Sequence, residues 1–285
     1  MLDEQLEKQM TSKKTIDAAV GSGDAILQPA EDIGMATVTL KKPVYMAKWG
    51  RGRLGGTGAL MVLGQRAEAQ GRPVRWMDGD LKSGTLSAFY GDRCSRAPSE
   101  DAVDFREWIM GDLDELTQDR QSRVLDVSGG SSSIEELLRD MELPSFCEEN
   151  GMRFTWLCPL GPNVEDFQHV QGAVDANHMQ PKDMLLVLNE GVVRKGQNAA
   201  GAFNPLMKSE GYMQLIEAGA RMLYLPQNPV MDEIRQIGVS YYDILADSRD
   251  PITGKVKAAR QHIVRRWLKA LETEIAAQKA EDWVP

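Results

Sequence analysis

Residues 44–80 read VYMAKWGRGRLGGTGALMVLGQRAEAQGRPVRWMDGD, and this stretch decides the fold. It begins with a short apolar run, 44–47, which is followed by a glycine-rich turn, 50–58. A helical pattern from 59 to 70 comes next, and a second apolar run, 74–77, ends in Asp78-Gly79-Asp80. A strand, a glycine-rich turn, a helix and a second strand in this order are typical of a parallel sheet that binds a ligand at one edge.

The glycine-rich turn matches the phosphate-binding pattern G-x-x-x-x-G-K-S/T from Gly50 to Thr57 at every position except one, because Gly56 stands where the pattern has lysine. Such a turn aims backbone N–H groups and the positive end of a helix at one point. Gly52 and Gly55, like Gly50, allow a phosphate to approach the backbone closely. Thr57 stands where a hydroxyl coordinates Mg²⁺. The alternative is that the glycines form only a tight connection between strand and helix.

Carboxylates follow the next apolar runs. Asp78 and Asp80 end the run 74–77, and Asp126 ends the run 123–125. The carboxyl ends of parallel strands meet at one edge of a sheet, so we expect these three side chains to lie together. There they could orient a metal-bound water and polarise an attacking water. Taken alone, Asp126 is equally well interpreted as a helix cap or a turn residue.

Strand-like and helical patterns alternate along the chain from about residue 43. This alternation predicts an α/β fold with a mostly parallel central sheet and helices on both faces. Residues 41–285 are expected to form a single domain, and residues 1–40 a flexible N-terminal extension. The expected strands are 43–48, 73–78, 123–127, 153–158, 184–189 and 221–225, and the expected helices are 58–70, 101–118, 133–142, 164–177, 209–219, 229–237 and about 254–279.

Composition excludes several classes of protein. The 285 residues are 42% hydrophobic, enough for a full core, yet no apolar run is long enough to span a membrane. The polar N-terminus does not have the pattern of a secretory signal, and the chain has three widely spaced cysteines, so we expect a cytoplasmic protein. The three scattered histidines argue against a structural metal site. A net charge of -9 argues against extensive contact with nucleic acid but leaves room for a local basic patch.

The stretch from about 43 to 240 resembles the ParA/MinD group of P-loop ATPases, which position plasmids, chromosomes and division machinery. In that family the loop reads G-K-G-G-x-G-K-S/T and carries a signature lysine early in the loop. Here Gly50, Gly55 and Thr57 match the family pattern. Arg51 takes the position of the signature lysine, Arg53 replaces a glycine, Leu54 fills the variable position, and Gly56 replaces the phosphate lysine. Gly58 directly follows Thr57 and is included in the expected nucleotide site.

The resemblance extends to later segments. Gly71 to Asp80 follows the family's "G-x-x-V-x-x-x-D-x-D" segment, and Asp126 with Gly129-Gly130 looks like the Walker B strand and second switch. Asn189 resembles the asparagine that holds adenine, and the loop around Pro226 resembles the one that closes over the base.

From the resemblance we expect ATP or ADP and Mg²⁺ as cofactors, with Thr57 and Asp126 at the metal. It also implies Asp80, Asp78 and Arg51 as catalytic residues and a homodimer linked to nucleotide. In this family the signature lysine reaches the partner's nucleotide, a task that Arg51 could keep.

Glycine at position 56 changes the expected chemistry. Loss of one preorganised contact to developing charge typically costs about 2.7–4 kcal/mol. Lys48, Arg51 and Arg53 are cations that could substitute in part. We therefore expect weakened or altered nucleotide binding, and hydrolysis that is slow or absent.

These features predict a nucleotide-binding switch protein that acts in plasmid partition, mobilisation or conjugative transfer. The alternative is a non-hydrolysing pseudo-ATPase that works as an interaction or adaptor protein. A small-molecule kinase fits less well, because no phosphoacceptor site is evident in the sequence.

The last helical pattern, about 254–279, has one apolar and one basic face. ParA-like proteins often bind DNA non-specifically through basic residues near the C-terminus, so this face is a candidate for contact with DNA, with a DNA-bound partner protein or with a membrane surface. The alternative is a docked terminal helix with a solvated charged face. The candidate DNA-binding residues are Lys255, Lys257, Arg260, Arg265, Arg266 and Lys269.

Overall fold

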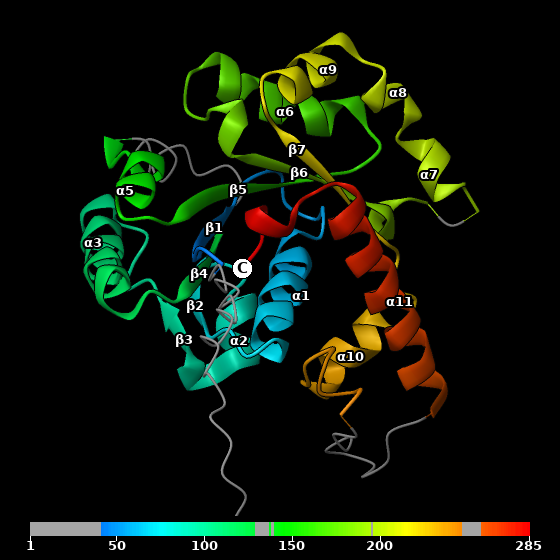
Figure 1. Ribbon diagram of the computed structural model, residues 1–285, viewed down its shortest axis with the longest axis horizontal. Coiled ribbons are helices and arrows are strands. Elements are labelled where there is room, and N and C mark those ends of the chain that lie inside the picture. Colours follow the sequence, from blue (N-terminus) through cyan, green and yellow to red (C-terminus); the bar gives the residue numbers. More distant parts are fainter. Residues whose placement is uncertain (1–40, 129–136, 138–139, 195, 247–257) are drawn as a thin grey trace, which may run out of the picture. The chain divides into compact units, whose positions relative to one another are not determined.

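A computed structural model of the protein describes residues 41–128, 137, 140–194, 196–246 and 258–285 (Figure 1). The expected extension, 1–40, lies outside these residues. The described part contains a seven-stranded sheet with the order β3-β2-β4-β1-β5-β6-β7, and all its neighbouring strands are parallel. The strands are β1 (Val44–Lys48), β2 (Val74–Gly79), β3 (Cys94–Arg96), β4 (Ser122–Val127), β5 (Arg153–Leu160), β6 (Met184–Asn189) and β7 (Arg221–Leu225).

Helices follow the strands along the chain. None of the described helices combines the length and apolar character that crossing a membrane requires. The α-helices are α1 (Gly56–Ala69), α2 (Thr85–Tyr90), α3 (Ala102–Asp119), α5 (Leu143–Glu149), α6 (Val164–Asp175), α7 (Ala199–Ala202), α8 (Asn204–Met207), α9 (Glu210–Glu217), α10 (Met231–Ile237) and α11 (Ala258–Ala277). Short 3-10 turns cover Gly91–Arg93, Pro181–Asp183, Glu190–Val192 and Glu281–Trp283.

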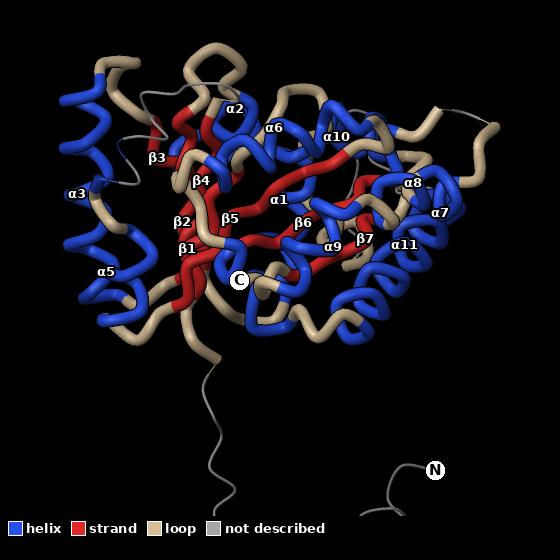
Figure 2. The backbone as a smooth tube through the Cα atoms, turned by 90° about the horizontal axis from the view of Figure 1, so that it is seen from above, coloured by secondary structure: helices blue, strands red, loops and turns tan. Residues whose placement is uncertain are grey.

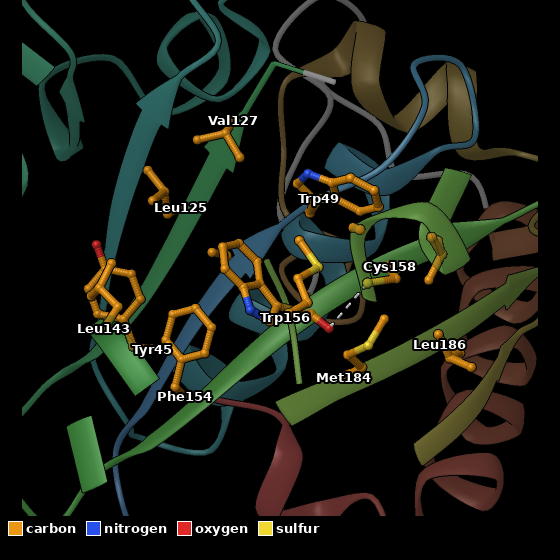
Figure 3. Close-up of a cluster of buried hydrophobic side chains, with 14 of the residues drawn as sticks. Tyr45, Trp49, Leu125, Val127, Leu143, Phe154, Trp156, Cys158, Met184 and Leu186 are labelled. Atoms are coloured by element: carbon orange, nitrogen blue, oxygen red, sulfur yellow. Dashed lines mark hydrogen bonds between the residues drawn. The ribbon is translucent and has the colours of Figure 1, made fainter. Parts of the chain in front are cut away.

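Successive side chains of each strand point to opposite faces of the sheet, and helices cover both faces, so both sets of side chains are buried. Val44 and Met46 of β1 belong to a core that includes residues of α1, α2, α10 and α11. Tyr45 and Ala47 belong to a second core with residues of α3, α5, α6, α8 and α9. Figure 1 shows these two groups of helices on opposite sides of the sheet, and Figure 3 shows the second core around Tyr45 and Trp156. In Figure 2, α3 and α5 lie toward one end of the sheet and α11 toward the other.

The expected parallel sheet is confirmed, with each of the six expected strands within two residues of its expected bounds. Five of the described strands and α-helices were not expected, namely β3, α2, α5, α7 and α8. Strand β3 is a three-residue, mostly polar segment that pairs in parallel with β2, with Cys94 opposite Trp76. Its own sequence has too little alternation of apolar and polar residues to indicate a strand. The expected helix 133–142 lies largely outside the described residues, and α5 follows it.

The C-terminal helix is fastened to α1 by charge as well as by apolar packing. Trp267 and Leu271 of α11 lie in the core with α1. The buried guanidinium of Arg66 donates two hydrogen bonds of 2.8 Å to Glu272, and it also binds Glu281. Described residues of α11 run from 258 to 277, inside the expected range of 254–279, while 247–257 lie outside the described part.

Candidate nucleotide site

The alternation of β1 decides where Lys48 lies. Lys48 has the same parity as Val44 and Met46, so its side chain is on the face that α1 covers. The parallel register pairs Ala47 with Leu125, which places Lys48 beside Asp126 one residue further on. Asp126 in turn pairs with Asp78 of β2. A cation and two carboxylates therefore form a row across three neighbouring strands at their carboxyl ends.

Asp126 is the centre of this row. Lys48 Nζ forms an ion pair with Asp126 Oδ1, and the side chains of these two residues are only 10% and 1% exposed. Thr57, in the first turn of α1, donates its hydroxyl to Asp126 Oδ2 at 2.6 Å. Burial raises the pKa of Asp126, while Lys48 and Thr57 act in the opposite direction. Both carboxylate oxygens are thus bound by residues of the loop or of the strand that leads into it.

The glycine-rich loop is closely packed at two of its glycines. A Cβ on Gly55, whose φ is 76°, would lie 2.2 Å from Asn189 Nδ2. A Cβ on Gly56 would lie 2.6 Å from Lys48 Cδ and 2.9 Å from Pro159 Cγ. Side chains at both positions would collide with their neighbours, since real Cβ contacts are longer than 3.0 Å. With Lys48, Pro159 and Asn189 in their observed positions, only glycine fits at 55 and 56.

Other loop positions are more open. A Cβ on Gly52 would meet no described atom within 4 Å, and a Cβ on Gly58 would make an ordinary contact, 3.8 Å from Met231 Sδ. Gly50 has a φ of 141°, and a Cβ there would lie 3.3 Å from Pro159. Arg53 has a φ of 70°, a left-handed conformation that favours glycine, and its side chain is exposed. The family glycine at this position thus fits the backbone better than the arginine does.

Asp80 and Asp78 have different environments. Asp80 Oδ1 accepts hydrogen bonds of 3.1 Å from the Ser83 amide and the Ser128 hydroxyl. Burial alone would raise the pKa of Asp80, but the hydrogen bonds of Ser83 and Ser128 and the charge of Lys48 lower it, so the group is an ionised carboxylate. Asp78 is fully buried and accepts the backbone amides of Asp80 and Ser87, which shape the turn after β2. A catalytic role for Asp78 stays a prediction, and its contacts give it a structural role.

Arg51 faces α6 within its own chain. Its guanidinium lies 3.2 Å from Asp166 Oδ1, on the first turn of α6, and its side chain is 51% exposed. Asp166 is buried, and its second oxygen has no hydrogen-bond partner among the described residues. Arg51 is therefore accessible at the rim of the loop, and a role across a dimer interface stays a prediction.

Asn189 and Pro226 follow the last two strands of the sheet. Asn189 Nδ2 donates to the Leu54 carbonyl at 2.8 Å, and its Oδ1 accepts the Gly191 amide at 2.9 Å. The amide therefore braces the loop backbone. The Pro226 carbonyl accepts the indole N–H of Trp267 at 2.7 Å, which ties the loop after β7 to α11. Contact of either residue with a base stays a prediction.

The candidate DNA-binding residues lie on α11 or outside the described part. Arg265, Arg266 and Lys269 are exposed. Arg260 is bound to Glu233 of α10 at 2.7 Å, so its charge is partly neutralised by a neighbouring helix. Lys255 and Lys257 lie outside the described residues.

These residues fit a magnesium-bound nucleotide in two respects. The loop presents a glycine cradle at the start of α1, and Thr57 and Asp126 lie together as the expected ligands of Mg²⁺, directly or through water. Among the described residues, no group of three or more His, Cys, Asp or Glu side chains could hold a metal ion alone. This suits Mg²⁺, which usually keeps several waters and binds one or two carboxylates together with substrate phosphates.

Comparison with known proteins supports the fold. The sequence matches no protein-family model and no curated protein. The MinC:MinD cell division complex of Aquifex aeolicus aligns with a TM-score of 0.50 at 12% identity, over 80% of this chain and 96% of the matched chain. MinD of the same organism aligns with a TM-score of 0.47 at 12% identity, over 80% and 97%. A Borrelia burgdorferi protein assigned to plasmid partition and bound to AMPPNP aligns with a TM-score of 0.46 at 8% identity, over 83% and 100%.

The likeness to the MinC:MinD complex shows the fold of this chain. The protein has the fold of the matched chain of that complex, with a parallel sheet and a glycine-rich loop between β1 and α1. The fold and the resemblance expected from the sequence are therefore confirmed.

Three participants in the site were not assigned from the sequence. Ser128 binds Asp80, Pro159 closes the space above Gly56, and Asp166 holds Arg51. Lys48 was one of three candidate cations, and only the strand order identifies it as the partner of Asp126. The signal for Lys48 was available in the sequence, because a lysine at the end of a buried strand requires a countercharge.

Proposed function

We propose that this protein is a nucleotide-binding switch of the ParA/MinD type that acts in the cytoplasm, in plasmid partition, mobilisation or conjugative transfer. It would bind ATP or ADP with Mg²⁺ and form a homodimer linked to the nucleotide. The loop from Gly50 to Gly58 would hold the phosphates, and Thr57 and Asp126 would hold the metal. When bound, Mg²⁺ would supply charge neutralisation at the phosphates.

One observation supports this proposal most strongly. Thr57 and Lys48 both bind Asp126 where the glycine-rich loop meets the carboxyl ends of β1 and β4. Burying a lysine and an aspartate together is costly, and a pair of apolar residues would often serve stability equally well. The cluster lies at the edge where parallel sheets bind their ligands, which favours a binding role over a purely structural one.

Hydrolysis should be slow. Position 56 contributes no side-chain charge to the β- and γ-phosphates, and each oxygen of Asp78 accepts a backbone amide. Asp80 remains as the ionised carboxylate near the loop that could polarise a water. A protein that binds nucleotide and turns it over slowly is suited to act as a switch.

Binding of ATP and of ADP with Mg²⁺, measured by calorimetry, tests the proposal. Thr57→Val should lower the affinity for the magnesium complex by about tenfold to hundredfold, the usual effect of removing a contact to a charged group. Thr117→Val changes an exposed threonine of α3 and should leave the affinity unchanged. Light scattering with and without AMPPNP would reveal a dimer that depends on nucleotide. Absence of ATP and ADP binding by the native chain would disprove the proposal.

The alternative is a pseudo-ATPase that serves as an interaction or adaptor protein. The observation that favours it is the backbone engagement of Asp78, each of whose oxygens accepts a backbone amide and shapes the turn after β2. Binding of nucleotide without any turnover, and no turnover change in Asp80→Asn, would support this alternative.

A further inference from the structure

We propose that Lys48, at the end of β1, supplies the phosphate-binding ammonium group that the loop lacks at position 56. Its ligand would be the β- and γ-phosphates of a nucleoside di- or triphosphate. This inference rests on the proposed nucleotide binding, and it assigns to a strand residue the task that P-loop proteins of this type give to a loop residue.

The first argument is steric. Lys48 Cδ and Cγ lie 2.6 and 3.0 Å from the position that a Cβ on Gly56 would occupy. The aliphatic chain of Lys48 therefore passes through the space in which a side chain at 56 would begin. A lysine at position 56 and the observed path of Lys48 exclude one another, so glycine at 56 is what permits Lys48 to reach the loop.

The second argument is the position of the charge. Lys48 Nζ and the Thr57 hydroxyl bind the two oxygens of the same carboxylate, Asp126. The ammonium group therefore lies next to the hydroxyl that is expected to face the metal and the phosphates. Its charge also lowers the pKa of Asp80, which directly follows β2. Lys48, Thr57 and Asp126 thus form one cluster at the candidate site.

The third argument compares Lys48 with the other cations of the loop. The Arg51 side chain is 51% exposed and is bound to Asp166, and Arg53 is exposed. Charges in water interact weakly with a phosphate, whereas a buried charge acts through a lower dielectric. Lys48, with a side chain 10% exposed, is the cation among these three that can act most strongly.

A purely structural role for Lys48, as the countercharge of Asp126, makes a different prediction. Removing a structural countercharge would disturb the site for every ligand, whatever its number of phosphates. Removing a phosphate contact would weaken only the ligands that carry the β- or γ-phosphate. Affinities for ATP, ADP, AMP and adenosine therefore distinguish the two roles.

The experiment uses Lys48→Met, which retains an unbranched chain over Gly56 but no charge. Calorimetry with Mg²⁺ should show that ATP and ADP bind about tenfold to hundredfold more weakly than to the native protein, as expected for a lost charged contact. AMP and adenosine should change less than about twofold, which is a few tenths of a kcal/mol. Lys42→Met, which changes an exposed lysine at the other end of β1, is the matched control and should bind all four as the native protein does.

Equal losses for all four ligands would overturn the inference and leave the proposed function intact. Unchanged affinity for ATP in Lys48→Met would do the same. No binding of ATP or ADP by the native protein would overturn the inference and the proposed function together.

Moving the charge gives a second, independent test. Lys48→Ala should lose most affinity for ATP, and Gly56→Lys alone should weaken binding because its side chain collides with Lys48 and Pro159. The double variant Lys48→Ala/Gly56→Lys vacates the space of Lys48, so only the side-chain ring of Pro159, 2.9 Å from the new Cβ, must shift. It should bind ATP at least about tenfold more tightly than Lys48→Ala, a gain of about 1.4 kcal/mol. Losses that simply add in the double variant would contradict the inference.

A test on the unmodified protein covers the case in which the variants fold poorly. An acyl phosphate of ATP acylates a lysine near the γ-phosphate, because the neutral amine attacks the acyl carbon and ATP leaves. Mass spectrometry should find the acyl group on Lys48, and excess ATP should prevent the labelling. Labelling of other lysines alone, or labelling of Lys48 that ATP does not prevent, would overturn the inference.

Discussion

Arg53 has an unfavourable backbone at the centre of the loop. Its φ of 70° costs a residue with a Cβ about 1–2 kcal/mol, and its exposed side chain makes no hydrogen bond or ion pair with the described residues. Such strain at a candidate site is a reason to expect a function for the residue. Glycine would relieve the strain but would lack the positive charge, so we expect the charge of Arg53 to be the reason that arginine stands here.

We therefore predict that Arg53→Gly stabilises the protein and weakens its ligand binding. The free energy of unfolding in urea should rise by about 0.5–1 kcal/mol, because relief of the left-handed strain exceeds the entropy that glycine loses. Arg53→Ala is the matched control, since it removes the charge and retains the strain. Lower stability of Arg53→Gly than of Arg53→Ala would contradict this account of the loop.

Residue patterns predicted the site only in part. The glycines, Thr57 and Asp126 were identified from spacing, and the structure brings Thr57 and Asp126 within 2.6 Å. The engagement of Asp78 with backbone amides could not be predicted, because it depends on the turn that follows β2. The contact of Lys48 with Gly56 depends on side-chain packing between neighbouring strands, which no spacing in the sequence records.

The pairing of β4 with α3 contains a buried ionic network. Arg123 lies in the interior of β4, fully buried, and donates to Asp112 of α3 at 3.1 Å and to Asp119 at 2.8 Å. Asp112 also lies 3.1 Å from Arg75 of β2. Burial raises the pKa of Asp112 to about 6, against the attraction of Arg123 and Arg75. The free energy that burial costs the ionised carboxylate is therefore larger than the free energy that it gains from the attraction of Arg123 and Arg75.

The raised pKa predicts how stability depends on pH. A folded-state pKa above the ordinary value of 3.8 means that the folded protein binds the proton of Asp112 more tightly than the unfolded chain does. Its contribution is complete below about pH 3.8 and is lost as the pH rises through 6, a change of about 3 kcal/mol. The stability advantage of the native protein over Asp112→Asn should shrink by most of this amount between pH 4 and pH 7.

Urea unfolding at a series of pH values measures this difference, in which other titrating groups cancel. Asp114→Asn, an exposed acid on the same helix, should give a difference that hardly changes with pH. If the advantage over Asp112→Asn grows with pH, Arg123 and Arg75 outweigh the burial of the carboxylate.

Elements were predictable to the extent that their own sequences carry the pattern. Long apolar runs gave the strands of the sheet's interior, and α3 was expected at 101–118 and found at Ala102–Asp119. Asp101 caps α3 by accepting the amides of Val103 and Asp104, a signal visible in the sequence. Strand β3 forms because β2 offers it a partner, and α2 has only six residues, so neither could be recognised locally.

For the whole molecule, the open question is what the basic face of α11 contacts. The apolar face of the helix is buried with α1, and Arg66 holds Glu272, so the helix is fixed to the domain that carries the loop. Arg265, Arg266 and Lys269 remain exposed on a chain whose net charge is -9. If α11 contacts DNA, these cations bind its phosphates. If the face is only solvated, they bind no DNA.

We predict non-specific binding of double-stranded DNA that depends on these three cations. Binding to DNA releases about 0.9 counterions for each phosphate contacted, so the triple alanine variant should reduce the slope of log affinity against log salt by about 2–3. The matched control removes three exposed cations from other elements, Arg106, Lys208 and Arg221, and therefore changes the net charge equally. Fluorescence anisotropy at several salt concentrations gives both slopes. Equal slopes for the two variants would mean that net charge alone governs binding and that α11 is a docked helix with a solvated face. A lower slope for the α11 variant alone would connect the DNA contact to the helix that packs against α1, and hence to the candidate nucleotide loop at the start of α1.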